Sequence, residues 1–163
     1  MKTIIGIDPG ASGAITFTNP TDKKLYAYKC HPEISGRRLS VSMALNAYEN
    51  KEAVAYIEKV HAMPHDGRSS LFKFGVNYGV WLGILNSIKA IDKIVEVSPQ
   101  KWMKFWEVKL GEKLPKVKKD RKNKLKEIAS IYTEKPATLW NADSVLITMY
   151  GVHQEEEISN DRK

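Results

Sequence analysis

The chain has 163 residues, 42% of them hydrophobic, and a formal net charge of +7. This length is sufficient for one compact domain and short for two full lobes, which argues against two-lobed folds. A single cysteine, Cys30, excludes an internal disulfide, and no apolar stretch is long enough for a signal peptide or a membrane span, so we expect a cytoplasmic protein without a membrane partner.

The first predicted element is an apolar strand over residues 4–7 that ends in an acidic residue, Asp8. Pro9 and Gly10 stop this strand, and residues 13–19 form a second strand, so the two should pair as an antiparallel hairpin. Residues 25–30 alternate well enough for a third strand. Asp8 either supplies the turn, as Asp-Pro-Gly often does, or carries chemistry, and the choice depends on what the rest of the chain brings near it.

A second acidic residue, Glu58, stands near the end of a predicted strand over residues 53–60. Residues 37–50, before it, have helical spacing of apolar side chains, so a helix precedes this strand and the strand is expected to run parallel to the first. Parallel neighbours end at the same edge of a sheet. We therefore expect Glu58 and Asp8 to meet there.

A long helix is predicted from about residue 69 to residue 90, and it contains Gly75, Gly79 and Gly83 at a spacing of four. Each glycine costs a helix interior about 1 kcal/mol relative to alanine. Three on one stripe imply that something approaches closely, either the sheet of the same chain or the helix of another subunit. A fifth strand is predicted over residues 93–97.

A short helix should open at Ser98 and Pro99, with serine as its cap and proline at its first position. Its aromatic residues, Trp102, Phe105 and Trp106, are interpreted as core or docking residues rather than as platforms for nucleobases. A basic linker is predicted at about residues 108–120.

The basic residues are concentrated in one part of the sequence. Between residues 109 and 126, nine lysine and arginine residues stand against two acidic residues, and this excess equals the whole net charge. Such localisation is typical of a surface that binds a polyanion, although a solvated helix surface would look similar. We therefore expect nucleic acid as a partner.

An amphipathic helix over residues 125–132 and a final helix after Pro136 complete the prediction, with Asp143 one turn into the final helix. Residues 154–163 are expected to form a flexible tail behind a single domain of residues 1–153. The layout brings Asp8, Glu58 and Asp143 to one sheet edge. Carboxylates this close repel one another unless a cation lies between them, and oxygen ligands without a histidine–cysteine cluster favour Mg²⁺ or Mn²⁺.

The sequence resembles the RuvC-type Holliday junction resolvases, in particular those of bacteriophages. The resemblance extends from residue 4 to about residue 151 and is carried by IGIDPGASGAI at 5–15, YIEKVHAMP at 56–64, SSLFKFG at 69–75, YGVWLG at 78–83, VSPQKW at 97–102 and ADSVLI at 142–147. It implies a ribonuclease H-like α/β fold, with a five-stranded mixed sheet of three antiparallel strands followed by two parallel strands, flanked by helices.

In activity, the resemblance implies a homodimer that nicks four-way and other branched DNA, leaving 5′-phosphate and 3′-hydroxyl ends, in the cytoplasm of a bacterial host. Two Mg²⁺ ions, for which Mn²⁺ may substitute, would be held by residues matching Asp8, Glu58 and Asp143, with no small-molecule cofactor. The glycine stripe would then be the dimer interface. Predicted DNA contacts are His61, Met63, Arg68, Lys73, Lys116, Lys118, Lys119, Arg121, Lys122 and Lys124.

The chain departs from the family at one position. A further acid usually stands about one turn before the aspartate matched by Asp143, and here Leu139 and Trp140 occupy that place, with Asn141 as the nearest polar substitute ligand. A junction-binding protein with a vestigial site is therefore the alternative to an enzyme. Ribonuclease H activity is also compatible with the acids, whereas an actin-like ATPase would need a second lobe and another phosphate loop.

Overall fold

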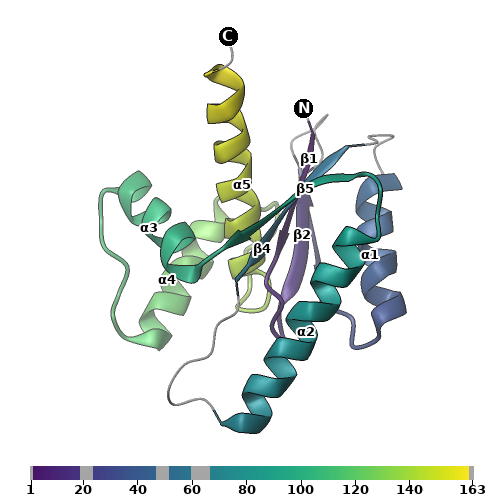
Figure 1. The fold of residues 1–163 in the computed structure, drawn as a ribbon. Coiled ribbons are helices and arrows are strands. Elements are labelled where there is room, and N and C mark those ends of the chain that lie inside the picture. Colours follow the sequence, from purple (N-terminus) through teal and green to yellow (C-terminus); the bar gives the residue numbers. More distant parts are fainter. Residues whose placement is uncertain (1, 19–23, 47–51, 60–66, 162–163) are drawn as a thin grey trace.

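A computed structural model describes residues 2–18, 24–46, 52–59 and 67–161 and contains one five-stranded sheet of order β3-β2-β1-β4-β5 (Figure 1). β1 pairs antiparallel with β2 and parallel with β4, β2 pairs antiparallel with β3, and β4 pairs parallel with β5. The predicted mixed sheet is thereby confirmed. The strands are β1 (Thr3–Ile7), β2 (Ala14–Thr18), β3 (Leu25–Lys29), β4 (Ala53–Glu58) and β5 (Ile91–Val97).

Helices cover both faces of the sheet, because successive side chains of its central strand point to opposite sides. Ile4 packs in one buried cluster, with Tyr56 and Trp102, whereas Ile5 and Ile7 pack in the other. Figure 1 shows α1 and α2 on one side of the sheet and α3, α4 and α5 on the other. The helices are α1 (Ile34–Asn46), α2 (Arg68–Asn86), α3 (Pro99–Leu110), α4 (Lys118–Ser130) and α5 (Ala142–Asn160).

α5 lies directly against β1 because Gly6 has no side chain. A Cβ atom at Gly6 would overlap Thr148 Oγ1 and would lie 2.7 Å from the backbone oxygen of Ser144. Two buried hydrogen bonds fix the same crossing: Thr16 Oγ1 lies 2.7 Å from Ser144 Oγ, and Thr148 Oγ1 donates to the carbonyl of Thr16 over 3.1 Å. The first turn of α5 is therefore held at the edge where β1 ends.

α3 has the predicted start. Ser98 Oγ accepts from the amide of Lys101 over 3.3 Å, and Pro99 is the first helical residue. The core role predicted for Trp102 and Trp106 is confirmed, since they are 1% and 0% exposed. The helix ends at Gly111, whose φ of 68° lies in the left-handed region that favours glycine.

The predicted basic linker over residues 108–120 is wrong in extent. Residues 108–110 are the last of α3 and residues 118–120 the first of α4, which leaves residues 111–117 as the connection. Arg121 donates from Nη1 to the carbonyls of Pro115 and Lys116, over 3.3 and 2.9 Å, so this connection is bonded to α4.

The predicted flexible tail is also wrong as far as it is described, because α5 continues to Asn160. Tyr56 donates to Glu155 Oε1 over 2.8 Å, and Lys93 Nζ lies 3.6 Å from the same oxygen. These bonds tie the acidic end of α5 back to β4 and β5. At its other end, α5 begins at Ala142 rather than directly after Pro136.

Candidate active site

Asp8 follows the last residue of β1 and forms the predicted turn. Its Oδ1 accepts from the amide of Gly10 over 3.0 Å, and its own amide donates to the carbonyl of Ala14 over 2.9 Å. A side chain at Gly13 would overlap the backbone oxygen of Asp8, so the hairpin closes tightly around it. The turn role is confirmed, and it leaves one carboxylate oxygen without a hydrogen bond among the described residues.

Glu58 is the last residue of β4, and the parallel register that pairs Ile7 with Ile57 places it beside Asp8, as predicted. Trp102 Nε1 donates to Glu58 Oε2 over 2.8 Å. Burial and, after it, the charges of Asp8 and Asp143 together raise the pKa of Glu58 to about 7, against the opposing effects of the Trp102 hydrogen bond and the charge of Lys122.

Asp143 lies in the first turn of α5 and reaches the same edge of the sheet. Burial raises its pKa and the charge of Asp8 adds to the shift, whereas Lys122 acts in the opposite direction. The pKa of Asp8 is likewise raised by burial. The three carboxylates therefore come close enough to interact electrostatically, in surroundings that disfavour their charge.

Lys122, from α4, is the cation nearest to this cluster among the described residues. Its Nζ lies 3.7 Å from Asp143 Oδ2, and its charge lowers the pKa values of Asp8 and Glu58 as well. The sequence predicts Lys122 as a phosphate contact and does not predict its place beside Asp143. Its spacing contains a signal, since Lys122 stands three residues before the buried Leu125 and so shares its helix face.

The donor set fits a hard divalent cation by its chemistry, because it consists of half-buried carboxylates with few hydrogen-bond donors around them. In the described part of the chain, however, no three acidic, histidine or cysteine side chains stand close enough together to form a closed set of metal ligands. An ion bound by Asp143 would compete with the ion pair from Lys122.

The side chain of Asn141 forms hydrogen bonds within the turn before α5. Its Oδ1 accepts from both the amide and the hydroxyl of Thr138, over 2.7 and 3.0 Å, which weighs against the predicted ligand role. Trp140, at the place of the missing acid, lies under Lys29, whose Nζ is 5.6 Å from the ring centroid. Leu139 is 55% exposed.

The predicted DNA contacts divide into several groups. His61, Met63 and the side chain of Arg68 lie outside the described residues. Arg121 is engaged with the connection before α4, and Lys124 Nζ pairs with Glu112 over 2.6 Å. The remaining members are exposed lysines on α2, on α4 and in the connection before it, namely Lys73, Lys116, Lys118 and Lys119.

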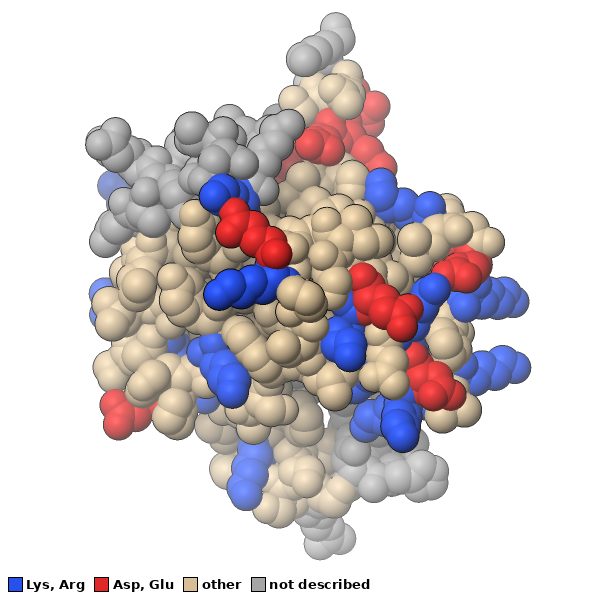
Figure 2. Space-filling view, turned by 180° about the vertical axis from the view of Figure 1, so that it is seen from behind, with Lys and Arg blue, Asp and Glu red and all other residues tan. Residues whose placement is uncertain are grey.

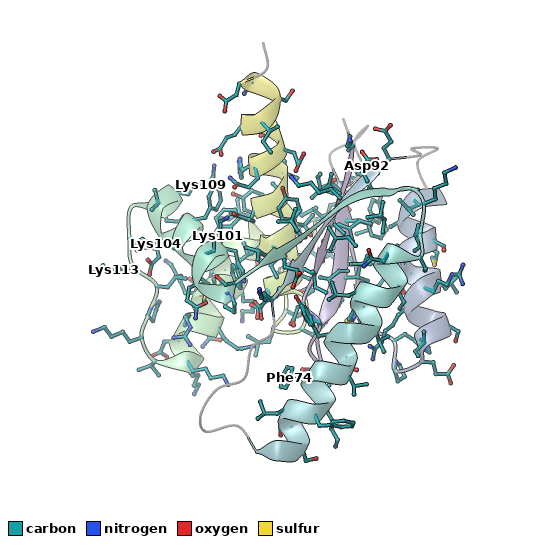
Figure 3. All side chains as sticks on the ribbon, in the orientation of Figure 1. Phe74, Asp92, Lys101, Lys104, Lys109 and Lys113 are labelled. Atoms are coloured by element: carbon teal, nitrogen blue, oxygen red, sulfur yellow. The ribbon has the colours of Figure 1, made fainter. Side chains whose placement is uncertain are left out.

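More lysines stand on the same side of the molecule. Figure 3 labels Lys101, Lys104 and Lys109 on α3 and Lys113 in the connection that follows. In Figure 2, blue side chains project from the right-hand edge, the side on which α3 and α4 lie once Figure 1 is turned by 180°. The basic surface thus extends from α4 over α3.

The glycine stripe of α2 does not pack against the sheet. Of the two neighbours predicted for the stripe, the sheet of the same chain is therefore wrong. A Cβ atom at Gly75, Gly79 or Gly83 would meet nothing within 4 Å among the described residues. α2 instead buries Trp81 and Leu85 on its other face. The open side also exposes Phe72 (74%) and Val76 (48%), and a second subunit remains the prediction for it.

Within the described residues, no helix is both long and apolar enough to cross a membrane.

Comparison with known proteins gives a likeness of fold. No protein-family model matches the chain, and no curated protein matches it. Among solved structures, Thermus thermophilus RuvC superposes with a TM-score of 0.58 at 14% identity, covering 95% of this chain and 96% of that chain. RuvC of the same organism in complex with a Holliday junction substrate gives 0.56 at 12% identity, with 96% of each chain covered.

The yeast mitochondrial Holliday junction resolvase Ydc2 has a TM-score of 0.48 at 11% identity, with 90% of this chain and 74% of that chain covered. The two Thermus structures establish that the chain has the ribonuclease H-like fold of RuvC, as the sequence predicted.

Proposed function

We propose that this protein is a metal-dependent endonuclease that resolves four-way and other branched DNA, acting as a homodimer in a bacterial cytoplasm. The observation that carries the proposal is the meeting of Asp8, Glu58 and Asp143 at one sheet edge, where burial raises the pKa of all three carboxyl groups and carboxylate repulsion adds to the shifts of Glu58 and Asp143. The fold shared with a RuvC that was solved with a Holliday junction supports the choice of substrate. We also propose a phage origin, on the basis of the sequence resemblance alone.

Asp8, Glu58 and Asp143 would hold two Mg²⁺ or Mn²⁺ ions. When bound, such ions lower the pKa of an attacking water and stabilise the departing 3′ oxygen, which yields 5′-phosphate and 3′-hydroxyl ends. Asp8 sits at the hairpin between β1 and β2, which hydrogen bonds at its own amide and carboxylate close, so its carboxylate would be a well-supported ligand. Trp102 holds the Glu58 carboxylate in place, and Lys122 balances the negative charge in the absence of metal.

The exposed lysines of α3 and α4 would contact the phosphates of the DNA arms. Phosphate contacts orient DNA without reading its sequence, so selectivity would come from the branched shape. Two active sites at a fixed separation would recognise that shape, and the open face of α2 is the surface that we assign to the second subunit. Figure 1 shows that the first half of α2 extends beyond the sheet edge where β1 and β4 end.

The test is cleavage of a synthetic four-way junction with each strand labelled in turn. In Mg²⁺ we expect paired nicks that a ligase reseals, on the junction and not on a linear duplex of the same sequence. Asp8→Asn should abolish the nicks, whereas Asp120→Asn, at an exposed acid of α4, should leave them unchanged. Equal cleavage by the Asp8 variant would refute the site, and preferred cleavage of RNA–DNA hybrids would refute the substrate.

One alternative has support of its own. Trp140 at the place of the fourth acid and the ion pair between Lys122 and Asp143 both favour a junction-binding protein with a vestigial site. That protein would bind the junction tightly, with an affinity that falls steeply with salt, and would give no products even in Mn²⁺. Cleavage in Mn²⁺ at a rate that depends on Asp8 would exclude it.

A further inference from the structure

Arg37, in α1, is a buried arginine whose bonded partners among the described residues are neutral. It is 7% exposed. Its Nε donates to the backbone oxygen of His31 over 2.6 Å, its Nη2 donates to Asn77 Oδ1 over 3.0 Å, and its guanidinium carbon lies 5.7 Å from the centroid of the Trp81 ring. In the described ranges, no aspartate or glutamate forms an ion pair with it.

A buried guanidinium without an anion is costly, and an apolar side chain would fill the space between α1 and α2 without that cost. The directional bonds of Arg37 therefore need a structural reason. They join two different parts of the chain, the turn before α1 at His31 and the middle of α2 at Asn77 and Trp81. Arg37 thus fixes the turn to α2.

The same turn is bonded to Asp8. Cys30, the residue before His31, donates from its amide to the carbonyl of Gly13 over 3.0 Å and from Sγ to the carbonyl of Asp8 over 3.4 Å. On the other side of the turn, the His31 ring lies against Gly36, where a Cβ atom would overlap it. A shift of this turn would therefore disturb its bonds to the backbone at Asp8 and Gly13.

The Asp8 carboxylate depends on that backbone for its direction. Its one hydrogen bond among the described residues comes from Gly10, two residues further along the hairpin between β1 and β2. A displacement of the turn at Cys30 and His31 would reach the backbone of Asp8 through the Cys30 bonds and would change where the Asp8 carboxylate points. No other bond among the described residues would hold the carboxylate in its original direction.

We propose that Arg37 is a positioning residue, which fixes the metal-binding direction of Asp8 by tying the turn at Cys30 and His31 to α2. This inference rests on the proposed function only in taking Asp8 as a metal ligand. α2 carries the proposed dimer face on its open side and the Arg37 contacts on another side. The same helix would therefore position the second subunit and support the active site of the first.

The variant Arg37→Met removes the hydrogen bonds and keeps most of the volume, and Arg38→Met, at the exposed neighbour on α1, is the matched control. Isothermal titration with Mn²⁺ should show about tenfold weaker binding to Arg37→Met than to the wild-type protein, as is typical when a residue that orients a metal ligand is lost. Arg38→Met should bind as the wild type does. Circular dichroism at the same temperature verifies that both variants are folded.

Asn77→Leu provides a second route if Arg37→Met does not fold, since it removes one acceptor of the guanidinium from α2. In the folded variants, hydrogen exchange at the amides of Asp8 and Cys30 should be faster than in the wild type. Half-maximal junction cleavage should need a higher metal concentration, in line with the weaker Mn²⁺ binding. The affinity for the junction should not change. The loss of Mn²⁺ affinity in the double variant should be smaller than the sum of the losses in the two single variants. Both substitutions remove the same connection between the turn and α2.

Wild-type Mn²⁺ affinity together with wild-type exchange at Asp8 and Cys30 in the folded Arg37 or Asn77 variants would overturn the inference. It can be separated from the proposed function, since titration and exchange need no cleavage. A wild-type protein that binds Mn²⁺ but cuts no DNA would end the nuclease proposal and leave the role of Arg37 to be decided by those two measurements. If the wild type binds no Mn²⁺, the metal-positioning role of Arg37 is refuted as well.

Discussion

The indole of Trp102 donates a hydrogen bond to the carboxylate of Glu58 over 2.8 Å, which joins the core of the α3 side to the candidate active site. Trp102 is 1% exposed and packs in the same buried cluster as Tyr56 and Val97. A residue that is part of the core by its packing therefore also fixes the orientation of a proposed metal ligand.

Trp102→Phe should separate these two roles, because phenylalanine keeps the ring but cannot donate. We expect about tenfold weaker Mn²⁺ binding and slower junction cleavage, with a loss of about 1–2 kcal/mol in the free energy of unfolding. The matched control is Trp106→Phe, which loses a hydrogen bond to the carbonyl of Leu146 instead of one to Glu58. If both variants bind Mn²⁺ equally well, Trp102 acts through packing alone.

Glu58 should make the metal-free protein less stable as the pH rises. Its pKa is about 7 in the folded protein against an ordinary value of 4.5, so the folded state binds the proton more tightly than the unfolded chain does. Its contribution to stability is therefore full below pH 4.5 and is lost as the pH rises through 7. The shift corresponds to roughly 3 kcal/mol.

Urea denaturation in EDTA at pH 5 and pH 8 measures this contribution as the difference between the wild type and Glu58→Gln. The wild type should lose stability relative to the variant at the higher pH, and Mg²⁺ should restore it at pH 8. A wild type that gains stability relative to Glu58→Gln between pH 5 and pH 8 would contradict the raised pKa.

Lys122→Met should affect metal binding and DNA binding in opposite directions. The positive charge of Lys122 acts on all three carboxylates, so its removal should lower the stability of the metal-free protein at pH 8. Mn²⁺ should bind more tightly to the variant, because it no longer competes with an ammonium group for the carboxylates. Loss of the same charge should weaken binding of the junction. Lys118→Met, at an exposed position of α4, should weaken junction binding without changing Mn²⁺ affinity. Weaker Mn²⁺ binding by Lys122→Met would show that Lys122 supports the site rather than competing for it.

Gly79→Ala and Gly79→Arg test the open face of α2. A Cβ atom at Gly79 meets nothing within 4 Å among the described residues, so alanine should stabilise the isolated subunit by about 1 kcal/mol through helix propensity. Arginine should leave the subunit folded but prevent close approach of a second copy. Light scattering after gel filtration should therefore show a wild-type dimer and a Gly79→Arg monomer, whereas dimers of both proteins would place the interface elsewhere.

The sheet and its acidic edge could be predicted because the evidence for them is local. Asp8 and Glu58 each close an apolar strand, and the helix between β3 and β4 indicates the parallel register that brings them together. Asp143 could be placed because it lies beside the apolar stripe of the last helix. Periodicity and strand endings are sufficient for such statements.

The predictions from the sequence are wrong where contacts between distant residues decide the structure. The glycines of α2 predict a close neighbour, but the pattern does not say whether that neighbour is the sheet or another molecule. The acidic end of α5 reads as a solvated tail, yet Glu155 bonds to Tyr56 on β4, far away in sequence. The buried bonds of Arg37 likewise join residues 31 and 77 and leave no sign in a local pattern.

The contact at Gly6 makes the separation of two proposed metal ligands depend on how closely two backbones approach each other. β1 carries Asp8 two residues after Gly6, and α5 carries Asp143 next to Ser144, whose backbone oxygen would lie 2.7 Å from a Cβ atom at Gly6. A methyl group at residue 6 would push α5 away from β1 and move Asp143 away from Asp8. The geometry of the candidate site thus depends on the absence of one carbon atom in a strand beside it.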